Sequence, residues 1–271
     1  MSQRLIGAGI IIAVLFLILF SNTIVIGIAA VIFSGLALYE AFNAFSFQKK
    51  PAFLALGLIS CISMPYLSEF SKNDVYTGVF IFIFVSCLVM VIFNKEISFA
   101  DISIFLFLIL LIPFSLSHII YLREIKPFGD LYIWLPFIGA SCSDSAAFFV
   151  GRAFGGRKLC EDLSPKKTVS GAIGGFFGSL FGFFVYSIIL IYMCKVNINY
   201  PNYYMLALLC SFVAQIGDLT ASAIKRHSHI KDFGNILPGH GGILDRIDSL
   251  IFTAPIVYIF IYNFGMIIMS K

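Results

Sequence analysis

At residues 218–249 the chain contains the stretch DLTASAIKRHSHIKDFGNILPGHGGILDRIDS, which is rich in acidic, basic and glycine residues. The runs on both sides of it, residues 203–216 and 250–269, are apolar and long. Charged residues enclosed in this way are typical of a polar site at the mouth of a membrane, because a bilayer excludes them from its hydrocarbon core. The stretch therefore predicts a membrane fold and a candidate active site together.

The composition agrees with a membrane protein. Of the 271 residues, 60% are hydrophobic and only 12% are charged, and the mean hydropathy is +0.99. Soluble domains carry about 25% charged residues, so a water-soluble surface cannot be assembled from this chain. The net charge of +4 is small, and Lys and Arg lie in short loops rather than on one basic face, which excludes nucleic acid as the expected partner.

The apolar runs predict the helices. The first run, residues 5–40, is too long for one crossing of roughly 20 residues, so we expect two short helices broken near Asn22. No convincing cleavage site follows residues 5–20, and we expect that segment to be retained. Further spans are predicted at about residues 52–68, 75–93, 101–121, 130–151, 172–194, 203–222 and 248–268. In lipid, a helix forms all its backbone hydrogen bonds within one segment, and nothing in this sequence indicates a β-barrel. The predicted fold is therefore all-α. We expect a polytopic integral membrane protein with about nine transmembrane helices.

The distribution of basic residues predicts the topology. With a cytoplasmic amino terminus, 13 Lys and Arg fall on the cytoplasmic side and 5 on the other, a clear positive-inside bias. We expect residues 1–128 to form N-terminal transmembrane helices. Residues 129–271 then form a C-terminal catalytic region with cytoplasmic loops at 151–170 and 223–247. Two spans separate these loops, so they lie on the same face and can build one site.

Three residues of the catalytic region stand out before the charged stretch. Asp144 lies inside an apolar span, where an unpartnered charge costs roughly 3 kcal/mol, so it is expected to face a polar cavity or a partner; a solvated Asp near the helix end is the alternative. Lys166 and Lys167 precede a helix start, where free amides attract anions such as phosphate. Simple positive-inside anchoring is the alternative for these two lysines.

The glycines at positions 174, 178 and 182 recur every four residues. This small-xxx-small pattern is typical of a helix face that packs closely against another membrane helix. We therefore expect it to serve helix packing rather than catalysis.

The charged stretch predicts a metal and phosphate site. Asp218, Ser222 and Lys225 share one helical face, although a self-satisfied Asp–Lys pair is the alternative. Asp245 and Asp248 share a face at the start of the last span. Carboxylates that converge among basic residues suit Mg²⁺, which binds a few carboxylates and the phosphates of a substrate. The basic residues in question are Lys225, Arg226, Lys231 and Arg246.

The Pro238–Gly242 segment predicts a tight turn. Gly241 and Gly242 leave the backbone open to close approach by a ligand. His240 is expected either to bind phosphate or to brace the turn. His227 and His229 are two residues apart, a poor spacing for one helical face, and are interpreted as interfacial residues rather than zinc ligands.

These residues together resemble a known family. The pattern Ser222-x-Ile224-Lys225-Arg226, Lys231-Asp232-x-Gly234, Leu237-Pro238-x-His240-Gly241-Gly242-Ile243-x-Asp245-Arg246-Ile247-Asp248 is similar to the defining motif of the phosphatidate cytidylyltransferases, and we see no departure at a fixed position. The likeness extends more loosely to Ser143-Asp144, to Ser164-Pro165-Lys166-Lys167-Thr168 and to the glycines that follow. The first four spans add nothing diagnostic.

The resemblance implies a reaction in which CTP and phosphatidic acid give CDP-diacylglycerol and pyrophosphate with Mg²⁺. It implies metal binding by Asp218 and Asp245, with Asp248 and Asp144 as neighbours, a monovalent cation such as K⁺ as a second ion, and a homodimer. We expect catalysis to depend on Asp218, Asp245, Asp248 and Lys225. Of these, the three aspartates are expected to hold the metal. Substrate contacts are expected from Asp144, Lys166, Lys167, Ser222, Arg226, Lys231, Asp232, His240, Gly241, Gly242 and Arg246. The expected location is a bacterial inner membrane with the site facing the cytoplasm.

Two other classes remain open from the residues alone. An ion-coupled transporter would also place Asp144 and Asp218 within the membrane, but it would move a substrate without consuming CTP. A CTP-dependent lipid kinase would use similar phosphate chemistry and release CDP instead of pyrophosphate.

Overall fold

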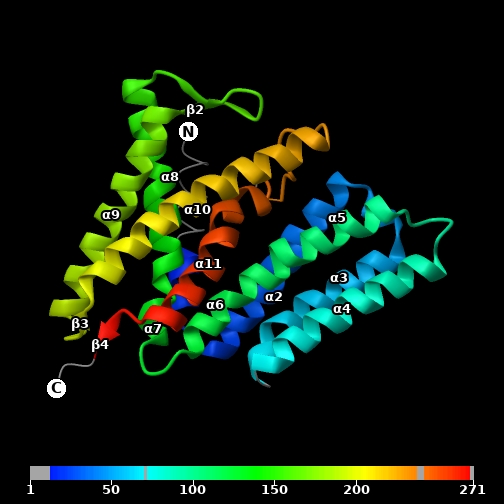
Figure 1. Ribbon diagram of the computed structural model, residues 1–271, viewed down its shortest axis with the longest axis horizontal. Helices are drawn as coiled ribbons and strands as arrows, with labels where there is room; N and C mark the ends of the chain where they lie inside the picture. The colour runs from blue at the N-terminus through cyan, green and yellow to red at the C-terminus, as the bar shows by residue number, and fades with distance from the viewer. Residues whose placement is uncertain (1–12, 70–71, 237–240, 269–271) are drawn as a thin grey trace. The chain divides into compact units, whose positions relative to one another are not determined.

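The computed structural model describes residues 13–69, 72–236 and 241–268, and the chain can be followed by colour in Figure 1. It divides into two compact units. The first unit comprises Met1–Tyr121 together with Asp232–Asp245, and the second comprises Leu122–Lys231 together with Arg246–Lys271. The loop that follows the long charged helix therefore belongs with the N-terminal helices. The domain division expected at residues 128 and 129 stays a prediction.

The first unit is built from helices. In chain order they are α2 (Thr23–Ala44), η1 (Phe47–Lys49), α3 (Pro51–Ser63), η2 (Met64–Glu69), α4 (Lys72–Ile92), α5 (Phe99–Ile109), η3 (Leu110–Phe114) and α6 (Ser115–Glu124), whose last residues pass into the second unit. The π-helical turn η3 contains Pro113, which lacks the amide needed to continue a regular α-helix. Residues 99–124 thus form one span with an internal irregularity.

The amino-terminal break predicted near Asn22 is confirmed. Residues 13–19 are helical, and a new helix begins at Thr23. The Asn22 side chain accepts a hydrogen bond from the Val25 amide at 3.0 Å, which satisfies one of the unpaired amides at the start of α2. A short polar residue at this position ends one helix and starts the next.

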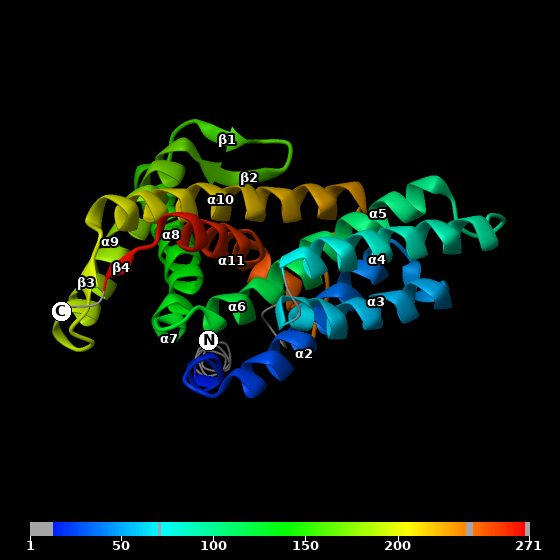
Figure 2. The ribbon, with the colours of Figure 1, turned by 60° about the horizontal axis from the view of Figure 1, so that its bottom comes forward.

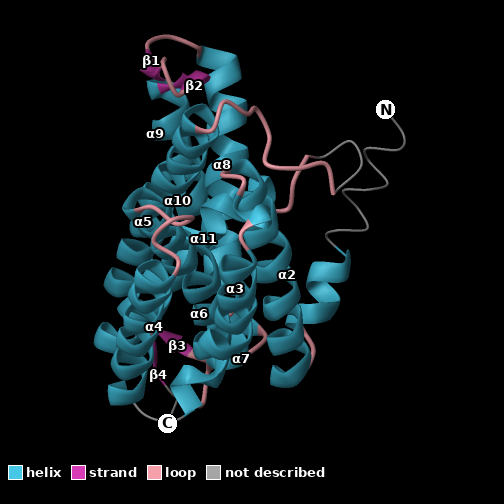
Figure 3. Ribbon diagram, turned by 90° about the vertical axis from the view of Figure 1, so that its right-hand side faces the viewer, coloured by secondary structure: helices cyan, strands magenta, loops and turns pink. Residues whose placement is uncertain are grey.

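In the part that the structure describes, the second unit contains four long helices and two short strand pairs. Its elements are α7 (Gly129–Tyr132), α8 (Trp134–Phe154), β1 (Lys158–Cys160), β2 (Ser164–Thr168), α9 (Val169–Tyr192), β3 (Asn197–Ile198), α10 (Tyr200–His227), α11 (Leu244–Phe264) and β4 (Ile267–Ile268). β1 pairs antiparallel with β2, and β3 pairs antiparallel with β4. Figure 3 shows the two pairs at opposite ends of this unit.

The glycine ladder packs α9 against α8, as the sequence predicts. A Cβ added at Gly174 would lie 2.5 Å from the Val150 Cβ, and one added at Gly182 would lie 2.5 Å from the Cys142 Sγ. Both distances are too short for real side chains, so only glycine allows this approach. The close contact fixes the position of α8 relative to the start of α9.

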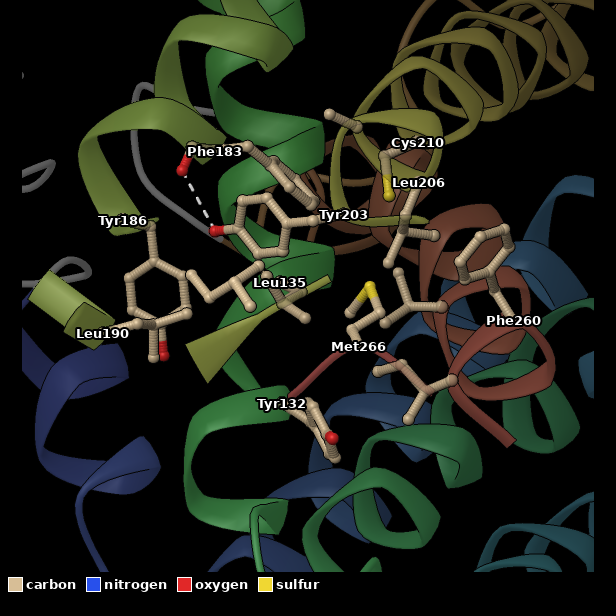
Figure 4. Close-up of a cluster of buried hydrophobic side chains, with 14 of the residues drawn as sticks. Tyr132, Leu135, Phe183, Tyr186, Leu190, Tyr203, Leu206, Cys210, Phe260 and Met266 are labelled. Carbon is tan, nitrogen blue, oxygen red and sulfur yellow. Dashed lines mark hydrogen bonds between the residues drawn. The ribbon is translucent and has the colours of Figure 1, made fainter. Parts of the chain in front are cut away.

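A hydrophobic core holds the other faces of these helices together (Figure 4). Phe183 of α9, Tyr203 and Leu206 of α10 and Phe260 of α11 are all at least 95% buried. The Tyr203 hydroxyl donates to the Phe183 carbonyl oxygen at 3.0 Å, because a buried hydroxyl needs a partner. The second unit is therefore a rigid frame on which polar side chains can be held.

The all-α membrane class is confirmed. In the described part of the chain, six helices are long and apolar enough to cross a membrane, and two further apolar helices, Pro51–Tyr66 and Tyr76–Ile92, are shorter. Every span predicted between residues 52 and 268 has a helical counterpart, while the expected number of nine includes residues 5–12, which lie outside the described ones. The small β pairs were not predicted; they satisfy backbone groups in connections between helices.

Candidate functional site

An ion pair between β2 and α10 lies at the centre of the site. Lys167 Nζ is 2.6 Å from Asp218 Oδ2, and their side chains are 24% and 36% exposed. β2 ends at Thr168, whose hydroxyl accepts from the Gly171 amide at 3.1 Å and caps α9. The same cap that starts α9 therefore holds Lys167 beside the helix that carries Asp218.

Two further acids gather around this pair. Asp144 of α8 interacts electrostatically with Asp218 and Lys167. Asp248 of α11 interacts with Asp218, Asp144 and Lys225. Four elements of the second unit thus bring three carboxylates and two lysines into one group, which we call the acid–lysine cluster: Asp144, Lys167, Asp218, Lys225 and Asp248. Like charges at this density need cations or a polar ligand to offset their repulsion.

The hydroxyl of Ser249 lies within reach of the Asp144 carboxylate. Its oxygen is buried and makes no hydrogen bond of ordinary geometry with any described residue. Ser249 is therefore placed to orient Asp144.

A cavity of about 530 Å³ opens beside the cluster. Its walls come from α8, the β1–β2 hairpin, the start of α9 and α10, and the hairpin can be seen in Figure 2. Asp144, Lys167 and Asp218 line it, together with the basic residues Arg152, Lys158 and Lys166 and the apolar side chains Phe148 and Leu159. The cavity therefore offers positive charge for phosphates and an apolar wall, a combination that suits an amphiphilic anionic ligand.

A partly buried polar network links the three helices beside the cluster. Ser143 Oγ of α8 and Ser211 Oγ of α10 are 2.9 Å apart. The Gln215 amide nitrogen donates to Ser211 Oγ and to the Ala172 carbonyl oxygen of α9, each at 3.1 Å. These bonds tie α8, α9 and α10 together one turn from Asp218, so they restrict the helix that presents this carboxylate.

The end of α10 also contacts the hairpin. The Arg226 Nε donates to the Leu163 carbonyl oxygen, between β1 and β2, at 3.4 Å. Ser222 is buried on the same helix, whereas Arg226 is exposed. Ser222 and Arg226, two of the predicted substrate residues, thus lie on α10. The Arg226 bond connects the loops at 151–170 and 223–247, which were expected to lie on one face.

The glycine-rich loop is described with the first unit. Asp245 Oδ2 accepts from the Gly242 amide at 3.2 Å and from the Phe233 amide at 2.9 Å. Gly241 has a φ of 81°, a left-handed conformation that favours glycine. Asp245 therefore closes its own loop in addition to any role toward a ligand.

The remaining predicted residues are placed as follows. Lys166, Lys231 and Asp232 are exposed, and Arg246 is exposed in the first turn of α11. His240 lies outside the described residues, as does the Pro238-Gly239 part of the turn. The structure brings Asp218 together with Asp144 and Asp248; the ion site shared by Asp218 and Asp245 stays a prediction.

The donor chemistry of the cluster fits Mg²⁺. Carboxylate oxygens are the hard ligands that this ion prefers, and it usually binds one or two of them and completes its shell with water and phosphate. Among the residues that the structure describes, no three His, Cys, Asp or Glu side chains are close enough to hold an ion by themselves. An ion held by few carboxylates and by substrate phosphates is consistent with this arrangement.

Comparison with known sequences identifies the family. The pattern of the Cytidylyltransferase family matches residues 2–264, which is nearly the whole chain. The chain belongs to the cytidylyltransferase family. The match includes the apolar N-terminal helices as well as the acid–lysine cluster, so both units are part of what the chain shares with this family.

Curated relatives in the cytidylyltransferase family resemble about half of the chain. A phosphatidate cytidylyltransferase of Bacillus subtilis is 40% identical over 148 residues, which are 55% of this chain and 54% of the relative. That of Brucella suis is 43% identical over 147 residues, 54% of this chain and 53% of the relative. That of Thermotoga maritima is 38% identical over 147 residues, 54% of each. The matched part therefore spans about half the length of these relatives.

One polar residue of the structure was missed in the sequence. Glu40 of α2 is 1% exposed and accepts hydrogen bonds from the Ile243 and Leu244 amides. It lies far from the motif in sequence, which is why the motif did not reveal it. The available signal was an acidic residue in an apolar helix, the same signal that singled out Asp144.

Proposed function

We propose that this chain transfers the cytidylyl group of CTP to phosphatidate, giving CDP-diacylglycerol and pyrophosphate. The acid–lysine cluster beside a cavity with basic and apolar walls is the observation that carries the proposal. Membership of the cytidylyltransferase family and the likeness to phosphatidate cytidylyltransferases support the choice of nucleotide and lipid. The chain would then be a nucleotidyltransferase of phospholipid synthesis.

In the proposed reaction, an oxygen of the lipid phosphate attacks the α-phosphorus of CTP. The new bond joins that oxygen to the α-phosphorus, while the bond from the α-phosphorus to the bridging oxygen of the β-phosphate breaks and its electron pair leaves with pyrophosphate. The lipid phosphate is already anionic at pH 7. The protein therefore needs to orient the two phosphates rather than to remove a proton, and no general base is required.

The side chains divide this work by charge. Lys167 and Lys225 of the cluster, with Lys166 at the cavity wall, would offset the negative charge of the two substrates. Phe148 and Leu159 would contact the acyl part of the lipid as it enters from the membrane. The fixed helices α8, α9 and α10 hold these groups in place, so little reorganisation is needed during the reaction.

We propose that Asp218, Asp245 and Asp248 hold Mg²⁺, with Asp144 as their neighbour. When bound, this ion offsets charge on the transferring and departing phosphates. The pairing of Asp218 with Lys167 supports this assignment, since it holds the Asp218 carboxylate at the wall of the cavity that both side chains line. A second monovalent cation such as K⁺ and a homodimer stay predictions.

We also propose that the protein resides in a bacterial plasma membrane with the site facing the cytoplasm. The bacterial relatives and the excess of Lys and Arg in the loops at 151–170 and 223–247 support this orientation. A cysteine introduced at Lys166 should react with an impermeant maleimide in inside-out vesicles only. Labelling from the periplasmic side would contradict the orientation.

The function is tested by following the label of CTP into lipid. Protein in detergent is given phosphatidate, Mg²⁺ and CTP labelled at either the α- or the γ-phosphate. A cytidylyltransferase places only the α-label in lipid and releases pyrophosphate, whereas a lipid kinase places only the γ-label in lipid and releases CDP. Lack of any CTP consumption would favour a transporter and would refute the proposal.

A pair of variants ties this activity to the site. Asp218→Asn should abolish transfer while the protein stays monodisperse. Asp162→Asn provides the matched control, because Asp162 is an exposed acid in the turn of the β1–β2 hairpin of the same unit and should keep full activity. Equal activities of the two variants would remove Asp218 from the site.

A further inference from the structure

Glu40 is a buried acid with an unusual pair of partners. It is the acidic residue of α2 and is 1% exposed. One carboxylate oxygen accepts from the Ile243 amide at 3.1 Å and the other from the Leu244 amide at 2.9 Å. A buried charge is costly unless it is hydrogen-bonded, so these two bonds are the local reason that Glu40 is tolerated inside the unit.

The same bonds supply a helix cap that the local sequence lacks. α11 begins at Leu244, and the residue before it is Ile243, whose side chain has no acceptor. The first amides of a helix have no partner within the helix and favour a negative charge nearby. Glu40, 203 positions earlier, provides both the acceptor and the charge.

Two glycines of the sequence motif make room for this carboxylate. A Cβ added at Gly242 would lie 2.5 Å from Glu40 Oε2, and one added at Gly234 would clash with Oε1. Neither Gly234 nor Gly242 adopts a positive φ, so backbone conformation does not explain why these residues are glycines. The space that Glu40 occupies does explain them, and it adds a reason for Gly242 to the predicted turn and ligand approach.

The loop that Glu40 holds is the one that presents Asp245. Asp245 Oδ2 accepts from the Phe233 and Gly242 amides, and Glu40 accepts from the next two amides along the chain. The three consecutive amides of residues 242–244 thus donate to two carboxylates, the first to Asp245 and the next two to Glu40. Displacement of Glu40 would release the amides next to Asp245 and shift its side chain.

We propose that Glu40 is a positioning residue, which sets the place of Asp245 through the start of α11 without touching substrate. This inference rests on the proposed function for its catalytic consequence, and on the contacts within the first unit for its structural part. Partners that orient metal-binding groups typically change metal affinity or activity by roughly 10- to 100-fold when removed. A loss of that size is therefore expected for Glu40→Gln.

The first test measures amide hydrogen exchange of the full chain in detergent. Glu40→Gln keeps the size of the side chain but replaces one acceptor oxygen with a donor, so exchange at residues 242–245 should become at least about tenfold faster. Asp101→Asn is the matched control: Asp101 also caps a helix of the first unit, accepting from the Ser98 amide at 2.8 Å, and pairs with Lys50 at 2.7 Å. It should leave exchange at 242–245 and the transfer rate unchanged.

The second test is a double-mutant cycle that reads out kcat/KM for CTP. Gly242→Ala should lower it strongly in the wild-type background but little in the Glu40→Ala background, because the methyl group then has no carboxylate to displace. Additive losses would overturn the proposal, and would indicate that Gly242 acts through a ligand. Unchanged exchange in Glu40→Gln, or faster exchange with an unchanged transfer rate, would also overturn it. Lack of lipid labelling by the wild-type protein would instead refute the proposed function, while the exchange test would still report on the Glu40 contact.

Discussion

Replacement of Lys167 by methionine is the most direct probe of the acid–lysine cluster. The change removes an ion pair with a separation of 2.6 Å and side chains 24% and 36% exposed. An exposed ion pair contributes up to about 1 kcal/mol to the free energy of unfolding. Loss of one partner from a buried pair lowers it by about 3–5 kcal/mol. Because the Lys167–Asp218 pair is half-buried, we expect its loss to lower the stability by about 1–3 kcal/mol. Asp144 and Asp218 would also repel each other more strongly, because both interact with Lys167.

The expected loss of activity is much larger than the loss of stability. Removal of one group that offsets charge in a phosphate-transfer site costs roughly 100- to 1000-fold in kcat. The assay is the rate at which labelled CTP enters lipid, expressed per amount of monodisperse protein. Thermal denaturation of the same samples separates unfolding from a catalytic defect.

Lys158→Met is the matched control for this prediction. Lys158 lines the same cavity from β1 but forms no ion pair with a described acid within 4.0 Å, so its loss should lower the rate less than the loss of Lys167. An Lys167→Met enzyme within about threefold of the wild-type kcat/KM would refute the role of the cluster. Equal losses in both variants would indicate that only the total charge of the cavity matters.

Three other changes test separate parts of the structure. Asp245→Asn should abolish transfer but keep the protein folded, because the amide oxygen can still accept from the Gly242 and Phe233 amides; near-normal turnover would remove the metal assignment. Gly178→Leu should prevent close packing of α9 on α8 and cost about 1–3 kcal/mol or more, seen as loss of the monodisperse peak in size-exclusion chromatography; a normal peak and melting temperature would contradict the ladder. Ser143→Ala and Ser211→Ala should each cost about 1–2 kcal/mol because the partner hydroxyl loses a bond, and the double variant should cost less than their sum; additive melting-point shifts would argue against a direct pair.

Apolar runs predict the membrane helices well because hydropathy and helix formation are coupled in a bilayer. They predict the helix ends less well. α10 was expected to end near residue 222 but continues to His227, since a helix can extend past the hydrocarbon with a polar last turn. The basic loop at 151–170 contains the β1–β2 hairpin, and strands of three to five residues are too short to give a periodic signal.

The site residues that could be predicted from the sequence lie in the motif at residues 222–248 or in polar positions of the neighbouring apolar spans. Helical spacing placed Asp218 with Lys225 and Asp248 with Asp245. Asp144 stood out as a charge in an apolar span, and the family resemblance implied that it is a neighbour of the other acids. Glu40 was not found, because its partners are backbone amides that no residue pattern reveals. Gly242 was interpreted through the tight turn and the approach of a ligand, and only the structure shows the Glu40 carboxylate that fills the space beside it.

The bond between Glu40 and the start of α11 has a consequence for biogenesis. Its two ends are 203 residues apart, and ribosomes add about 5–20 residues per second, so Glu40 is added to the chain roughly 10–40 s before its amide partners exist. During this interval the newly made helix carries an acid with no permanent partner, at the insertion site or in the bilayer. The N-terminal helices can therefore complete their assembly only when translation of the chain is nearly finished.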